Sequence, residues 1–170
     1  MRDDLIIFIA IIASVVIGGY LFIYGGPKFD SQTIAIPQQS QGSFSVLAEG
    51  QDSGAVSRRA NYRIMTDEQF AELWRMIYGE DGPAIPAIDF SKDEVIAVFD
   101  GSHSSGGYRV SVTEVTDADG ARAVHITREE PGENCAVVSA LTSPFQIVRV
   151  AKTALPLIRE EQVVVRDCGI

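Results

Sequence analysis

The hydrophobic positions of the chain form one long uninterrupted run, followed by a series of short patterned segments. Residues 5–24 read LIIFIAIIASVVIGGYLFIY and contain no charged residue. At 1.5 Å per residue, a helix of this length spans about 30 Å, the thickness of the hydrocarbon core of a bilayer. We therefore expect a transmembrane helix over residues 5–26, preceded by a short cytoplasmic end at residues 1–4.

A cleaved secretory signal and a buried helix of a soluble domain are the alternatives for this run. The apolar part of a signal peptide is shorter, about 7–15 residues, and ends at a cleavage site of small residues. Here the run continues through Tyr20, Phe22 and Tyr24, and no such site follows it. The pattern favours an uncleaved, single-pass anchor in the cell membrane. Because so few residues precede the run, the simplest topology places the rest of the chain outside the cytoplasm.

The segment after the run changes in composition twice. Residues 27–43 are polar, rich in Gln and Ser, and lack sustained periodicity, which predicts a flexible linker. From Phe44 onward, short apolar segments alternate with turn residues. We expect residues 44–170 to form one extracytoplasmic domain.

One segment of this domain has the pattern of a helix. Thr66 is a favourable N-cap residue, Gln69 completes a capping box, and Gly79 is placed to end the helix. Apolar residues recur between these limits at the spacing of one helix face. They are Phe70, Leu73, Trp74 and Ile77.

The remaining pattern predicts β-strands. Val95–Phe99 is apolar on both faces, which indicates a central strand covered on both sides. The residues Asp117–Gly120 predict a hairpin turn. Further segments with strand character are 57–65, 108–112, 121–127, 136–141, 145–150 and 162–166. The expected fold class is α+β or mainly β, a compact and largely antiparallel sheet domain with one packed helix.

The net charge and the cysteine content indicate which classes of partner and which cellular compartment fit the chain. Residues 44–170 carry twelve basic and twenty acidic residues, a net charge of −8, which excludes nucleic acid as a partner. The two cysteines, Cys135 and Cys168, both lie in the part expected outside the cytoplasm, where a disulfide persists. A bridge between them is one expectation, and two free thiols are the other.

The loop SHSSGGY contains residue types found in hydrolases. Asp100, His103 and Ser105 supply an acid, a base and a hydroxyl within six residues. Neighbours on one loop rarely hold the geometry of a catalytic triad, and no G-x-S-x-G turn is present. We therefore expect no catalytic residue, and a hydrolase using the His103 and Ser105 loop is the alternative. Histidine and cysteine spacing predicts no metal site, and no cofactor is expected.

The same loop has the features of a binding turn. Gly106 and Gly107 permit positive φ and the close approach of another chain, and Tyr108 is of a type favoured at interfaces. The candidate residues for binding a partner are Ser104, Ser105, Gly106, Gly107 and Tyr108. A tight connection between strands, without a binding role, is the alternative.

Several short motifs follow one another in a characteristic order. They are Leu73-Trp74, PAIDFSK at residues 86–92, Val95–Phe99, Gly101, Gly106-Gly107-Tyr108 and Ser143-Pro144-Phe145. This succession, over roughly residues 55–155, resembles the C-terminal domain of the protease complex subunit PrcB family. Ser104–Tyr108 also loosely resembles a loop of chagasin-type inhibitors of cysteine proteases. The PrcB resemblance implies an exported accessory domain that associates with a protease, with no catalytic residues to carry over.

The resemblance and the anchor together give the functional expectation. We expect a membrane-anchored, non-enzymatic module that binds protein, as a protease-associated or protease-regulating accessory subunit whose partner is an exported protease. Besides the hydrolase, a structural module of the cell envelope is an alternative. The anchor and the pair Cys135 and Cys168 are not part of the motif.

Overall fold

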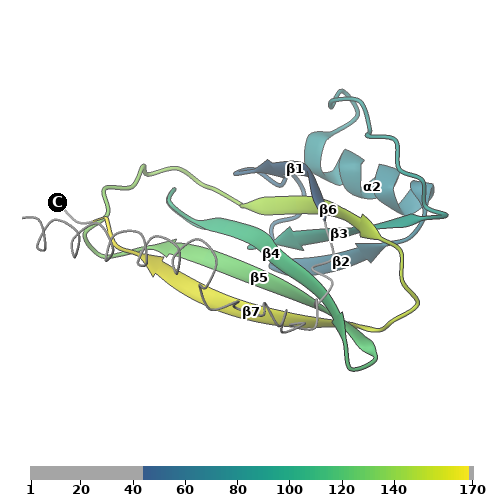
Figure 1. Cartoon of the computed structure of the whole chain (residues 1–170). Helices are drawn as coiled ribbons and strands as arrows, with labels where there is room; N and C mark the ends of the chain where they lie inside the picture. Colours follow the sequence, from purple (N-terminus) through teal and green to yellow (C-terminus); the bar gives the residue numbers. More distant parts are fainter. Residues whose placement is uncertain (1–43, 169–170) are drawn as a thin grey trace, which may run out of the picture. The chain divides into compact units, whose positions relative to one another are not determined.

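The structure is a computed structural model that describes residues 44–168, which form two β-sheets and one α-helix (Figure 1). The expected cytoplasmic end, transmembrane helix and linker lie outside the described residues. Within residues 44–168, no helix has the length and apolar character needed to cross a membrane. The expectation of a mainly β domain with antiparallel sheets and one helix is confirmed.

The first sheet has four strands, each antiparallel to its neighbours. Their order is β1 (Ser45–Gly50), β6 (Phe145–Ala151), β3 (Asp93–Phe99) and β2 (Ala60–Ile64). Helix α2 (Asp67–Tyr78) lies over one face of this sheet (Figure 1). The predicted central strand is therefore β3, which has a neighbour on each side.

The second sheet has three strands in the order β4 (Arg109–Ala118), β5 (Ala121–Pro131) and β7 (Leu157–Arg166). Strands β4 and β5 form the predicted hairpin, and Asp119 and Gly120 at its tip have φ of 53° and 76°. Two successive positive φ angles are typical of a type I′ turn. Strand β7 pairs with β5 in parallel, which departs from the antiparallel pattern elsewhere.

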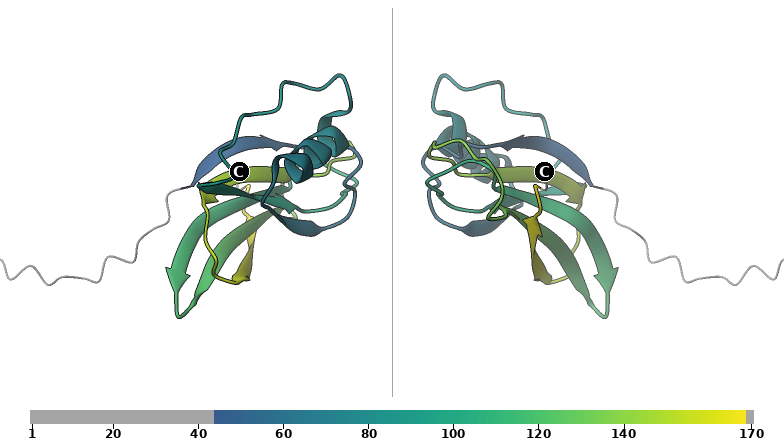
Figure 2. Two further views of the ribbon diagram at one scale, coloured as in Figure 1. Left: turned by 90° about the vertical axis from the view of Figure 1, so that its right-hand side faces the viewer. Right: turned by 90° about the vertical axis from the view of Figure 1, so that its left-hand side faces the viewer.

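The first sheet is sandwiched between the helix and the second sheet, as two further views show (Figure 2). On β3, Val95, Ala97 and Phe99 pack towards α2, whereas Ile96 and Val98 pack towards the second sheet. Successive side chains of a strand point to opposite faces, so a strand with two covered faces needs apolar residues at every position. The prediction that Val95–Phe99 is a strand covered on both faces is therefore confirmed.

The helix begins and ends where the sequence predicts. Thr66 Oγ1 accepts a hydrogen bond from Gln69 N at 3.3 Å, and the Gly79 N–H donates to Arg75 O at 2.8 Å. The side chain of Gln69 reaches back to accept from Met65 N, one residue before the N-cap. All four residues of the predicted apolar stripe are buried in the core between α2 and the first sheet.

Two strand predictions need correction. Residues 136–141 do not form a strand, and the prediction of one there was wrong. Their backbone bonds to the loop after β3 instead of joining either sheet. The segment 162–166 is only the end of β7, which already begins at Leu157. The charged residues from Arg159 to Glu161 interrupt the apolar pattern and hide the first half of that strand.

Candidate functional site

The candidate site is formed by two loops that lie side by side, residues 100–108 and residues 135–144, called the loop pair below. His103 and Thr142 form an isolated antiparallel bridge, with N···O distances of 2.7 and 3.0 Å. Thr142 Oγ1 also donates to Ser105 O at 2.8 Å, and Gly106 N donates to Val138 O at 2.9 Å. These bonds hold the two loops together along most of their length.

The two glycines of the loop pair are packed against the chain itself. Gly107 has φ of +96°, as expected, and a Cβ added there would lie 3.0 Å from the side chain of Val137. Gly106 is buried, and a Cβ added there would lie 2.8 Å from Val138 Cγ2. The close approach that the glycines permit is thus made by residues 137 and 138 of the same chain. Because Gly106 is buried, its backbone is not open to the approach of a partner chain in this arrangement.

A buried carboxylate holds the start of the loop after β3. Asp100 Oδ1 accepts hydrogen bonds from Arg128 Nη1 at 2.5 Å and from Arg59 Nη2 at 3.2 Å. Its other oxygen, Oδ2, lies 2.8 Å from His103 Nε2. Arg128 belongs to β5 and also donates to Glu161 of β7 at 3.3 Å. Asp100 therefore connects the loop to the second sheet, and Glu161 extends this connection to β7. Burial acts to raise the pKa of Glu161, but the hydrogen bond from Arg128 and its positive charge lower it below its ordinary value.

His103 lies between Asp100 and an aromatic ring. The rings of His103 and Tyr108 are stacked, with centroids 3.7 Å apart and an angle of 9° between their planes. Within residues 44–168, His103 makes no side-chain hydrogen bond to a serine. Ser105 takes part in the loop pair through its carbonyl, which accepts from Thr142. The three residue types of a triad are close in sequence, but this arrangement does not bring the Ser105 hydroxyl onto the imidazole.

The second loop exposes apolar side chains on a backbone that is fixed at both ends. A disulfide joins Cys135 to Cys168, with the two Cα atoms 5.0 Å apart. At the far end, Ser143 N donates to Gln51 O at 2.7 Å. Between these points, Val138 and Leu141 are 70% and 80% exposed. The sequence signal for these two exposed residues is an apolar segment without alternation. It lies between the polar residues 131–134 and Thr142-Ser143. Its composition led instead to the prediction of a strand.

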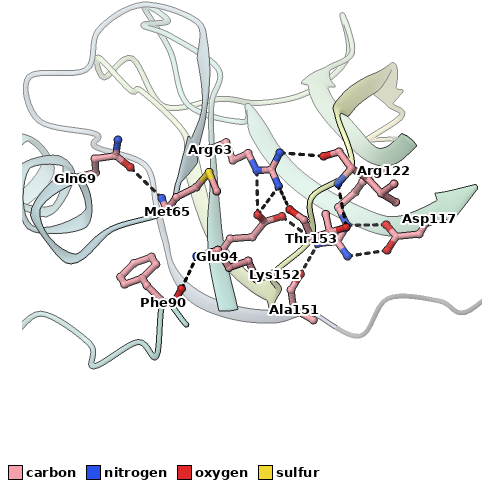
Figure 3. A network of polar contacts seen from close by, with 11 residues as sticks. Arg63, Met65, Gln69, Phe90, Glu94, Asp117, Arg122, Ala151, Lys152 and Thr153 are labelled. Atoms are coloured by element: carbon pink, nitrogen blue, oxygen red, sulfur yellow. Dashed lines mark hydrogen bonds and ion pairs between the residues drawn. The ribbon is translucent and has the colours of Figure 1, made fainter. Parts of the chain in front are cut away.

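A second network of buried charges lies at the other end of β3 (Figure 3). Glu94 is fully buried and accepts from Arg63 Nη2 at 2.6 Å and from Arg122 Nη1 at 3.0 Å. Arg122 also donates to Asp117 Oδ1 at 2.6 Å and Oδ2 at 2.8 Å. The hydrogen bonds from Arg122 lower the pKa of Asp117, and those to Asp117 raise the pKa of Arg122. Each of these charges has an opposite partner, so the network joins the sheets and presents no free group to a ligand.

The described part of the chain contains no group of three or more His, Cys, Asp or Glu residues arranged to hold a metal ion. His125, the second histidine, lies on β5 with its Nδ1 atom 3.2 Å from Glu160 Oε2. It therefore pairs with a carboxylate on β7 and not with a residue of the loop pair.

Comparison with known proteins finds a family match over the segment that contains the loop pair. Residues 95–151 match the family model described as PrcB C-terminal, which confirms the resemblance seen in the sequence over that segment. The matched segment begins on β3, contains both loops of the candidate site and ends with β6. No curated protein and no solved structure matches the chain.

Proposed function

We propose that this chain, with its PrcB C-terminal segment, is a membrane-anchored accessory subunit of a protease, and that its task is to bind protein. The observation that carries the proposal is the exposure of Val138 and Leu141 on a loop fixed at both ends. Apolar side chains on a rigid backbone lose little conformational entropy on binding, and exposed apolar patches mark interaction sites. Both residues lie inside the segment that matches the family.

The candidates from the sequence stay part of this proposed surface in modified roles. Gly106 and Gly107 shape it, because they let the second loop pack closely. Ser104 is exposed beside them and is free to contact a partner. Tyr108 has one ring face covered by His103, so its contribution is confined to the rest of the ring.

A non-enzymatic role is supported by the surroundings of His103. A serine nucleophile needs its base within hydrogen-bond reach, and among residues 44–168 the only side-chain hydrogen bond of the His103 ring is to Asp100, with none to a serine. A hydrolase using His103 and Ser105 requires the loop to rearrange. The backbone bridge between His103 and Thr142 opposes such a movement.

The proposed location is the cell membrane, with the described domain outside the cytoplasm. The uncharged run at residues 5–24 supports the anchor. The pairing of Cys135 with Cys168 supports an oxidising compartment, because disulfides are rare in the reducing cytosol. An exported protease is the partner that fits both this location and the family.

The test is co-purification of the full-length chain from membranes of its own cells, with mass spectrometry of the proteins retained. A variant with Val138→Ser and Leu141→Ser removes the exposed apolar surface and keeps the backbone. Ile85→Ser, which alters an exposed apolar residue outside the matched segment, is the control.

We expect a protease to be retained by the native chain and by the Ile85→Ser variant, and to be lost from the loop variant. Thermal melts establish that all three chains are folded. The proposal is overturned if no protease is retained by the native chain, or if the folded loop variant retains it equally. If the purified chain has a hydrolytic activity and His103→Ala abolishes it, the result would instead support the alternative of a hydrolase that uses His103 and Ser105.

A further inference from the structure

We propose that two copies of this chain associate through the outer edge of β7, so that the second sheet continues across a two-fold axis. This proposal is independent of the protease partner, because it uses the outer edge of β7 and not the exposed side chains of Val138 and Leu141. Three features of β7 support such a pairing: its free edge, its exposed valines and the order of its charges.

Among the described strands, β7 is the edge strand with the least protection against pairing. Strands β1, β2, β4 and β7 are the four edges of the two sheets. The pairing of β1 and that of β4 are each interrupted by a bulge or irregularity, and β2 has five residues. Strand β7 has ten residues in an unbroken register with β5 and contains no proline. Proteins protect free edges with bulges, prolines, short strands or charged side chains, and of these β7 has only the charges.

The edge also exposes apolar side chains on both faces of the strand. Val163, Val164 and Val165 are 55%, 43% and 63% exposed. Consecutive residues of a strand point to opposite faces, so neither face of β7 is covered at this end. β-branched residues on a free edge form a template for a further strand, and a second copy of the same strand supplies matching residues.

The charges on β7 select one antiparallel register for such a pair. A two-fold axis perpendicular to the sheet keeps each face of β7 on the same side in both copies. The centre of the pairing is then a single residue that lies opposite its own copy. With Val163 at the centre, Glu160 lies opposite Arg166 of the partner subunit, and the symmetry repeats this pair. Arg159 likewise lies opposite Asp167 of the partner subunit.

The neighbouring registers lack this complementarity. With Glu161 at the centre, two carboxylates lie directly opposite each other. With Gln162 at the centre, no two charges meet, and with Val164 at the centre Glu161 lies opposite Asp167 of the partner subunit. Opposite charges across a strand pair are stabilising and like charges are destabilising. The register centred on Val163 is therefore the one that the charges favour.

The two charges that define this register are accessible in the single chain. Glu160 is more than half exposed, although its carboxylate also lies near His125. Arg166 is exposed and forms no salt bridge with any residue that the structure describes. A self-complementary strand requires a cation near one end of the edge and an accessible carboxylate some residues earlier, and Arg166 and Glu160 supply them.

The test is the oligomeric state of the full-length chain in detergent, measured by sedimentation over a range of protein concentrations. We expect the native chain to dimerise. Glu160→Arg and Arg166→Glu each convert two attractive pairs into repulsive ones and should weaken the dimer about tenfold. The double variant reverses both members of each pair and should recover the native affinity. Arg109→Glu, an equal charge reversal on the opposite edge strand β4, is the control and should have no effect.

Each result supports or overturns the proposal. A native chain that stays monomeric overturns it, and so does a dimer that neither single reversal weakens, because its contact then lies elsewhere. Failure of the folded double variant to recover the dimer, or equal weakening by Arg109→Glu, excludes the register centred on Val163. Loss of protease binding in the earlier experiment leaves this result unaffected, because the two experiments alter different strands and loops.

Discussion

Asp100 and Arg128 form an ion pair in the interior of the protein, with 2.5 Å between Oδ1 and Nη1 and side chains that are 2% and 1% exposed. Glu94 and Arg122 form a second buried pair at 3.0 Å. Glu94 lies near the start of β3 and Asp100 directly follows its end, so ion pairs to Arg122 and Arg128 of β5 join both ends of β3 to a strand of the other sheet. The loop pair begins at Asp100, and this arrangement therefore fixes the position of the candidate site relative to the second sheet.

The first prediction concerns this ion pair. Replacing Asp100 with alanine leaves the buried guanidinium of Arg128 without its closest partner, and we expect a loss of about 3–5 kcal/mol in the free energy of unfolding. The measurement is chemical unfolding of the full-length chain. Arg59→Ala is the control, because Arg59 is 54% exposed and its bond to Asp100 is worth about 0–1 kcal/mol. Equal effects of the two variants would show that the buried pair does not stabilise the fold.

The second prediction compares two glycines with positive φ. Gly120→Ala, at the hairpin tip, meets nothing within 4 Å and should cost only the left-handed conformation, about 1–2 kcal/mol. Gly107→Ala adds contacts at 3.0 Å with Pro131 and Val137, and should lower the thermal midpoint further. The difference between the two variants measures how tightly the loops pack. If the two midpoints fall equally, Pro131 and Val137 do not pack against Gly107 in solution.

The third prediction concerns the disulfide. Titration of the unfolded, unreduced chain should find no free thiol. The pair Cys135→Ser and Cys168→Ser opens a link across a sequence separation of 33 and should reduce stability by about 2–4 kcal/mol. Because the bridge fixes one end of the second loop, this variant should also lose the proposed protease binding. Two reactive thiols in the chain isolated from its native compartment would contradict the prediction.

The fourth prediction is a dependence of stability on pH. Hydrogen bonds from Arg122 lower the pKa of Asp117 below its ordinary value of 3.8 in the folded state. A carboxyl group with a lowered pKa stabilises the fold above its ordinary pKa, and this contribution disappears as the pH falls through the lower, folded value. Asp117→Asn should therefore reduce stability at neutral pH and make its decline in acid less steep. Thermal melts from neutral pH into acid measure the effect.

The control for this prediction is Asp119→Asn. It removes a carboxylate from the same turn, keeps a residue that tolerates positive φ, and leaves both partners of Arg122 in place. A pH profile changed equally by the two variants would mean that the total charge, and not the contact with Arg122, determines the acid sensitivity.

The fifth prediction concerns the amino-terminal anchor. The uncharged run at residues 5–24 should remain in the mature protein, so amino-terminal sequencing should begin at or near residue 1. The protein should stay in the membrane fraction after washing with high salt and at alkaline pH, because burial of an apolar helix does not depend on charge. Recovery of a soluble chain that begins after residue 24 would show that the run is a cleaved signal.

The sequence by itself determined those elements whose signals are local. The capping residues and the apolar spacing placed the helix within one residue at each end, and the turn Asp117–Gly120 placed the hairpin. The run Val95–Phe99 indicated a strand covered on both sides, because apolar residues at consecutive positions of a strand require two cores. These patterns depend on residues within about one turn or one strand of each other, which is the range over which backbone propensity acts.

Tertiary structure alone decided which distant segments meet. The parallel pairing of β5 with β7, the contact of Asp100 with Arg128 across 28 residues, and the packing of Val138 on Gly106 join segments far apart in the chain. Residues 136–141 have the composition of a strand but pair with neither sheet, so they remain in a loop in which Val138 and Leu141 are exposed. A local pattern states which residues prefer an extended backbone, whereas the partner of that backbone is determined by the competition among all strands for the same edges.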